Sequence, residues 1–153
     1  MARAYAPVAA VLLVAVTVVA AAGVRAFLPS LPGDSPEPRG VAAEATSDGT
    51  VALTLLAGPR VNPGPLDVRV EVEGEPLARQ PPVPFFSASG FHSGPTGAFN
   101  AASDDDWTVG ETVTFRIAAT NEPVPAVGDT VRVELRARGQ LLGAAETTVE
   151  SAS

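Results

Sequence analysis

Apolar and polar residues alternate along most of the chain beyond residue 40, which is the pattern of β-strands that bury one face. In the clearest run, four apolar residues alternate with three charged ones: Leu66, Val68, Val70 and Val72 with Asp67, Arg69 and Glu71. The same period of two predicts further strands at residues 41–46, 50–57, 75–79, 112–118, 130–137 and 140–150. The pattern therefore predicts about seven short strands.

Glycine-containing dipeptides punctuate these strands at Asp48-Gly49, Glu73-Gly74 and Arg138-Gly139, and such pairs favour tight hairpin turns. Seven short strands joined by Gly and Pro turns predict a mainly β domain over residues 40–150, an Ig-like antiparallel β-sandwich. The order of the strands is left open. VRVEV at 68–72 resembles VRVEL at 131–135. A duplicated hairpin and two strands of similar composition both explain that likeness.

Residues 5–28 break the alternation, because they form one continuous apolar run. Between Ala4 and Val24 about 21 residues carry no charge, and about 20 suffice to cross roughly 30 Å of hydrocarbon as a helix. A single span can satisfy its backbone polar groups in lipid only as a helix. The run predicts one transmembrane helix over residues 5–28, with Arg3 and Arg25 at its two ends.

Residues 29–39 hold four prolines, one glycine and two acidic residues, which predicts a semi-stiff Pro-rich linker. We therefore expect a single-pass protein of the cell membrane, with lipid as one partner and an extracellular C-terminal domain. Three interpretations of the N-terminal segment remain open. It is a cleaved secretory signal, an uncleaved anchor, or a helix that follows a short processed leader.

The third interpretation rests on a resemblance. Arg3-Ala4, followed by Tyr5-Ala6-Pro7-Val8 and the run VLLVAVTVVAAA, resembles the N-terminus of archaeal type IV pilins, particularly haloarchaeal ones. The chain departs from that family at Tyr5, where an aliphatic residue is usual, at Ala6 for serine, and at Ala9-Ala10 for the common Ile-Gly.

The resemblance implies that residues 1–4 are a leader that a prepilin peptidase removes between Ala4 and Tyr5. The residues that it assigns to processing are Arg3, Ala4, Tyr5, Ala6 and Pro7. It also implies that helix 5–28 anchors the subunit in the membrane and then packs against other pilin subunits in a filament core, without any cofactor.

The composition narrows the classes of function further. The chain has no cysteine, which excludes disulfides, thiolate metal sites and a cysteine nucleophile. From residue 29 onward, 17 acidic residues face 8 arginines, an excess of nine negative charges that repels nucleic acid and anionic lipid headgroups. High acidity without any lysine suggests a salt-loving, GC-rich microbe as a hypothesis.

Residues 80–107 lack periodicity and carry five of the eight aromatic residues in a Pro-, Gly- and Ser-rich background: Phe85, Phe86, Phe91, Phe99 and Trp107. A loop of this length is uncommon in a compact domain unless it is functional or disordered, and its aromatic residues argue against disorder. Two interpretations follow. Either the rings complete the core at an open edge of the sandwich, or they form a contact surface for a neighbouring subunit or a ligand.

Two further features invite chemistry. His92 is the only histidine, with no partner in the sequence for a metal site and no G-x-S-x-G nucleophile motif, so we expect no enzyme. Asp104 to Asp106 suggest calcium, but an EF-hand loop would need glycine and glutamate where Val109 and Phe115 stand. An irregular Ca²⁺ site and a solvated acidic turn both stay open.

Taken together, the sequence predicts a pilin-like structural subunit, a minor or accessory one, of an archaeal type IV pilus that acts in adhesion or in surface filaments. The alternative is a monomeric, membrane-tethered extracellular β-sandwich that binds a ligand and never polymerises.

Overall fold

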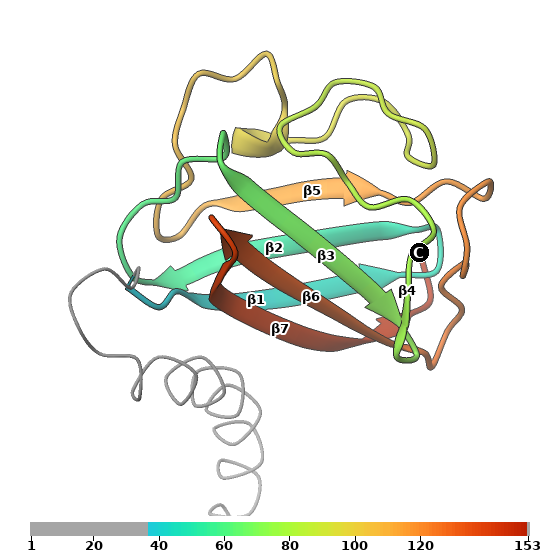
Figure 1. The fold of residues 1–153 in the computed structure, drawn as a ribbon. Helices are drawn as coiled ribbons and strands as arrows, with labels where there is room; N and C mark the ends of the chain where they lie inside the picture. The colour runs from blue at the N-terminus through green and yellow to red at the C-terminus, as the bar shows by residue number, and fades with distance from the viewer. Residues whose placement is uncertain (1–36, 153) are drawn as a thin grey trace, which may run out of the picture.

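Seven strands curl into one sheet in the part of the chain that the computed structural model describes, residues 37–152 (Figure 1). Their bounds are β1 Gly40–Thr46, β2 Thr50–Ala57, β3 Leu66–Val72, β4 Glu75–Pro76, β5 Thr112–Arg116, β6 Thr130–Ala137 and β7 Gln140–Glu150. The prediction of a mainly β domain is confirmed. The leader 1–4, the helix 5–28 and most of the linker 29–39 lie outside the described residues.

The helical content of the described residues is small. A three-residue 3-10 turn, Gly97–Phe99, precedes β5. Within residues 37–152 no helix is both long and apolar enough to cross a membrane.

The sheet runs in the order β4-β3-β6-β7-β1-β2-β5, and it is mixed. The expectation of an entirely antiparallel arrangement is wrong at one place, because β1 and β7 pair in parallel through Ala45 with Val149 and Thr46 with Glu150. All other neighbours are antiparallel. Alternation in a sequence reports which face of a strand is buried, and it carries no signal for the direction of a neighbouring strand.

The core lies inside the curl, where the inward residues of the strands meet in one cluster. Its fully covered side chains include Val51, Leu53 and Leu55 of β2, Val68, Val70 and Val72 of β3, and Val131, Val133 and Leu135 of β6. These are the residues that the alternation places inward. Each such side chain stabilises the fold by about 1.5–3 kcal/mol through its removal from water.

The two similar segments VRVEV and VRVEL pair with each other. Val68 lies opposite Leu135 and Val72 opposite Val131, in antiparallel register. This register sets Arg69 against Glu134 and Glu71 against Arg132 on the outward face. Because an R-x-E pattern read in opposite directions places each cation opposite an anion, the likeness between β3 and β6 favours their pairing.

Two hairpin turns follow the dipeptides that the sequence marks. Glu73 and Gly74 have φ of 53° and 79°, and Arg138 and Gly139 have φ of 52° and 79°, the two positive angles of a type I′ turn. The strand after Gly74 is shorter than predicted, with two residues instead of five. Pro76 has no N–H to donate to the sheet, so the strand ends there. The side chain of Gln80 then accepts from the N–H of Val70 and donates to its C=O, as the backbone of a longer strand would.

The edge strand β5 is also covered. Residues 91–96 run along it, with isolated bridges from Phe91 to Ile117 and from Thr96 to Thr114. The N–H groups of His92 and Thr96 donate to the carbonyls of Arg116 and Thr114. Covering an edge in this way removes the unpaired backbone groups that recruit a strand from another chain.

The chain enters the sheet through a close backbone contact. The N–H of Arg39 donates to the C=O of Leu142 in β7 at 2.7 Å. The residue that follows Leu142 in this strand is Gly143. A Cβ at Gly143 would lie 2.6 Å from the backbone oxygen of Arg39, so only glycine fits there. The start of β1 is thus held against β7.

The turn between β1 and β2 generates a prediction about pH. Asp48 Oδ1 accepts hydrogen bonds from Thr46 Oγ1 at 2.6 Å and from the Thr50 N–H at 3.0 Å. These bonds lower the pKa of the Asp48 carboxyl from 3.8 to about 2, and the bond from Thr46 has the largest effect. A carboxyl whose pKa is lower in the folded state than in the unfolded state stabilises the fold at any pH above its unfolded-state pKa. This stabilisation is lost as the pH falls through the folded-state pKa.

We therefore expect the difference in unfolding free energy between the wild type and Asp48→Asn to shrink between about pH 4 and pH 2, since asparagine keeps the acceptor oxygen but cannot titrate. Urea denaturation of the full chain in a neutral detergent over that range measures the difference. A difference that stays constant across the range would contradict the assignment.

Candidate functional site

The aromatic residues of segment 80–107 divide into four buried rings and one exposed ring. Phe85, Phe91, Phe99 and Trp107 belong to the core, whereas Phe86 is 60% exposed. For the four buried rings, the interpretation that applies is completion of the core. A contact surface in this segment would have Phe86 as its only aromatic side chain.

The buried rings pack against β5. The Phe99 ring lies 5.4 Å from that of Trp107 and 6.4 Å from that of Phe115, measured between centroids. The Phe91 ring lies 5.8 Å from Phe85 and 6.0 Å from Phe115. Trp107 Nε1 donates to the Glu111 carbonyl at 2.8 Å, so the indole is buried with its polar group satisfied.

A buried asparagine fixes the start of the segment. Asn121 Oδ1 accepts from the N–H of Arg79, and its Nδ2 donates to the carbonyls of Arg79 and Gly90. A buried amide with all of its groups bonded holds one geometry, because each lost bond would leave a polar group unsatisfied. Asn121 thereby ties the loop between β5 and β6 to both ends of residues 79–90.

The two features of the sequence that suggested chemistry, His92 and the run Asp104 to Asp106, line different pockets. His92 borders a shallow pocket of about 230 Å³ with Thr50 and Arg116. Asp104 to Asp106 line a second, open hollow together with Glu111, and Arg60 Nε lies 3.4 Å from Asp106 Oδ2. No group of three or more His, Cys, Asp or Glu side chains is placed to hold a metal ion within residues 37–152.

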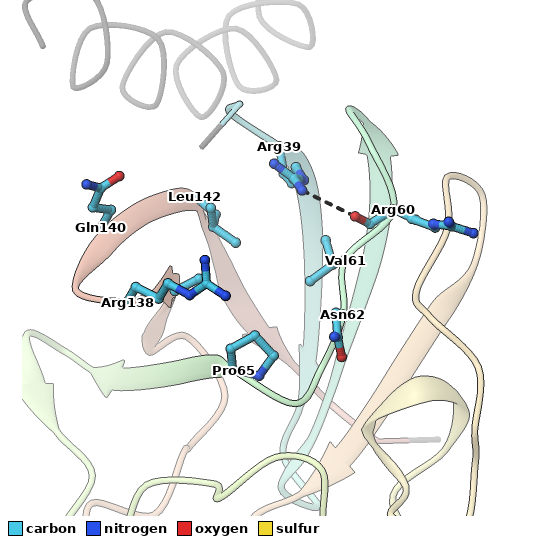
Figure 2. Close-up of a pocket in the computed structure, with 9 residues that line it drawn as sticks. Arg39, Arg60, Val61, Asn62, Pro65, Arg138, Gln140 and Leu142 are labelled. Atoms are coloured by element: carbon cyan, nitrogen blue, oxygen red, sulfur yellow. Dashed lines mark hydrogen bonds between the residues drawn. The ribbon is translucent and has the colours of Figure 1, made fainter. Parts of the chain in front are cut away.

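A further pocket lies where the chain enters the domain, and we name it the entry pocket (Figure 2). Its volume is about 410 Å³, within the range of small-molecule sites. The residues that line it come from the start of β1, the β2–β3 loop and the β6–β7 hairpin: Arg39, Arg60, Val61, Asn62, Pro65, Ala137, Arg138, Gln140 and Leu142. Sequence reasoning did not single out any of them as site residues.

Arg39 forms one rim of the entry pocket and is held by backbone oxygens. Its guanidinium donates to the carbonyls of Glu37, Pro59 and Arg60, the last at 3.2 Å (Figure 2). Partial burial lowers the pKa of the Arg39 guanidinium, and Glu37 opposes that effect. The side chain therefore fastens the entering chain to the β2–β3 loop.

Arg138 forms the opposite rim, from the turn between β6 and β7. Its guanidinium reaches toward the space between Leu142 and Pro65, whereas the side chain of Arg60 points away from the pocket (Figure 2). Of the eight arginines in residues 37–152, four form ion pairs with carboxylates, and Arg138 is one of the four that form none. The two rims of the pocket thus carry one arginine that is bonded to backbone carbonyls and one that is not, and neither forms an ion pair within residues 37–152.

Comparison with protein-family models, with curated proteins and with solved structures finds no match for this chain.

The aromatic cluster generates a pair of matched substitutions. We expect Phe99→Ala to lower the free energy of unfolding by about 3–5 kcal/mol, because it leaves a cavity between Trp107 and Phe115. Phe86→Ala, at an exposed ring, should change it by no more than about 0.5 kcal/mol. Denaturant titration of the full chain measures both, and an equal effect of the two substitutions would contradict the placement of the rings.

Proposed function

We propose that this chain is a pilin-like structural subunit of an archaeal type IV pilus, a minor or accessory one that acts in adhesion or in surface filaments. The observation that carries the proposal is the N-terminal sequence. An uncharged run of about 21 residues follows Arg3-Ala4 directly, with Tyr5-Ala6-Pro7-Val8 at its start. In this proposal a prepilin peptidase removes residues 1–4, and segment 5–28 holds the subunit in the cell membrane before assembly.

The described domain is, in the same proposal, an Ig-like β-sandwich that stands outside the cell. The strand pairing supports this class. β1, β2 and β5 form one group and β4, β3, β6 and β7 the other, with antiparallel pairs β2–β5, β3–β6 and β6–β7. In Ig-like domains, whose strands are lettered A to G in chain order, strand B likewise pairs with strand E, and strands C, F and G lie side by side. By chain order these correspond to β2 with β5, and to β3, β6 and β7.

The covered edges of the sheet support assembly through the N-terminal segment. Residues 91–96 cover β5, and β4 together with the Gln80 side chain covers part of β3. A sheet with protected edges is poorly suited to polymerise by strand addition, so copies would associate through another surface. Segment 5–28 offers one, because it contains several small residues that allow close helix packing.

The attachment of the linker also suits a filament subunit. The Arg39 guanidinium binds three carbonyls and its N–H bonds the Leu142 carbonyl, so the direction in which the chain leaves the domain is fixed. A fixed exit would give the chain the same direction at residue 39 in every copy, which is compatible with the repeated subunit orientation of a helical assembly.

The alternative function is a monomeric, membrane-tethered binding module. The open entry pocket, with its arginine rim, is the observation that favours it. The two functions differ in whether copies of segment 5–28 lie against one another.

The absence of cysteine allows a direct test. In the organism that makes the protein, we expect Ala15→Cys, within the proposed filament core, to give disulfide-linked dimers in filaments sheared from the cell surface after mild oxidation. Arg69→Cys, at an exposed side chain of β3, is the matched control and should stay monomeric. Non-reducing electrophoresis of the sheared fraction reads out both, and a chain that stays monomeric in the membrane fraction in both variants would favour the tethered module.

A further inference from the structure

The entry pocket combines two cations with an apolar wall. Arg39 and Arg138 stand on opposite rims, with Val61, Pro65 and Leu142 around the space between them (Figure 2). Ala137 also lines the pocket. We propose that this pocket binds an oxyanion that carries a short apolar group, such as a phosphate monoester with an alkyl chain.

The position of Arg138 supports the proposal. The residue occupies a turn position with φ of 52°, where asparagine or glycine is the favoured choice and a long side chain is uncommon. Arg138 is exposed and, like Arg39 on the other rim, has no carboxylate partner across the described residues. The turn thus directs an uncompensated cation toward a hollow in an otherwise acidic domain.

Arg39 supplies further hydrogen-bond donors. A guanidinium has five N–H groups, and three of those of Arg39 go to the carbonyls of Glu37, Pro59 and Arg60. The two that remain can donate to an anion. Carbonyl oxygens do not neutralise the charge of Arg39, and burial lowers the pKa of its guanidinium, so an anion at this rim would relieve the cost of that burial.

The apolar side chains define the rest of the ligand. Among the apolar residues that line the pocket, Pro65 is exposed and Ala137 is half-buried, so these two offer it most of the apolar surface. Val61 and Leu142 are 2% and 3% exposed and belong to the core behind them. A free inorganic anion would contact only the two arginines on the rims and would leave the apolar lining exposed to water. An alkyl group of about four carbons would cover the wall as well, at about 0.8 kcal/mol for each CH₂ that is fully buried.

The same chemistry can come from two sources, a phosphate ester in solution or a phospholipid headgroup. The second source rests on the proposed function, since it needs segment 5–28 to lie in a membrane. Ten residues, 29–38, span about 31 Å as polyproline II, so a pocket within about that distance of segment 5–28 is within reach of the headgroups only if the linker does not hold the domain away. The net negative charge of the domain repels an anion, but this repulsion is screened beyond about 8 Å at physiological salt, so the charges close to the pocket decide the contact.

The test uses the full chain in micelles of a neutral detergent, with n-butyl phosphate as the probe. Amide shifts in ¹⁵N NMR spectra should saturate at Ala137, Arg138 and Gly139, and inorganic phosphate should bind several-fold more weakly. Arg138→Asn removes the cation but forms an Asn-Gly turn, the favoured type I′ sequence, so the hairpin should keep its fold. We expect it to weaken binding of n-butyl phosphate about tenfold, as the loss of one charge-assisted contact.

Arg69→Gln, which removes one charge from the outward face of β3, is the control and should leave the affinity unchanged. The proposal is overturned if n-butyl phosphate shows no saturable binding. It is equally overturned if both variants weaken binding alike, because that result would indicate a bulk charge effect.

A second arm distinguishes the sources. In nanodiscs that contain phosphatidylglycerol, the three amides should already be shifted without added ligand if the headgroup occupies the pocket. If they are unshifted and n-butyl phosphate still moves them, the ligand is a soluble ester. A chain that does not insert into nanodiscs would contradict the proposed membrane anchor, while the titration with n-butyl phosphate would still decide the pocket.

Discussion

The position of β1 between β2 and β7 is the constraint on which the rest of the domain depends. β1 links β2 and β5 on one side to β7, β6, β3 and β4 on the other, so the seven described strands form one curled sheet with a single core. Glycine at 143 permits this junction, because any side chain there would collide with the backbone of Arg39. The junction also determines where the preceding chain leaves the domain, and it brings Arg39 next to the β6–β7 turn.

The strands were predictable because the buried face recurs at every second residue. The bounds of β2, β3, β6 and β7 agree with the alternation, and the turns at Glu73-Gly74 and Arg138-Gly139 follow from a residue pair that tolerates positive φ. The parallel pair of β1 and β7 could not be predicted, since alternation says nothing about neighbours. The entry pocket was missed for a related reason, because Arg39 and Arg138 are distant in sequence and meet only through that pair.

The aromatic segment shows how a core of small side chains is completed. The inward strand positions are mostly valine, alanine and leucine, which leave space beside β5. Phe85, Phe91, Phe99 and Trp107 fill that space from a segment without regular structure, and the same segment covers the edge of β5. Sequence reasoning identified these residues as a group but left core and contact surface open, because an aperiodic segment gives no sign of which side chains point inward.

The central claim is that segment 5–28 stays on the finished protein as its anchor and assembly surface, while the described domain has its edges covered and its exit fixed. The mass of the mature chain, purified from the organism that makes it, tests this most directly. The account predicts a chain that begins at Tyr5. A chain that begins near Gly23, and so has lost the apolar segment, would contradict it.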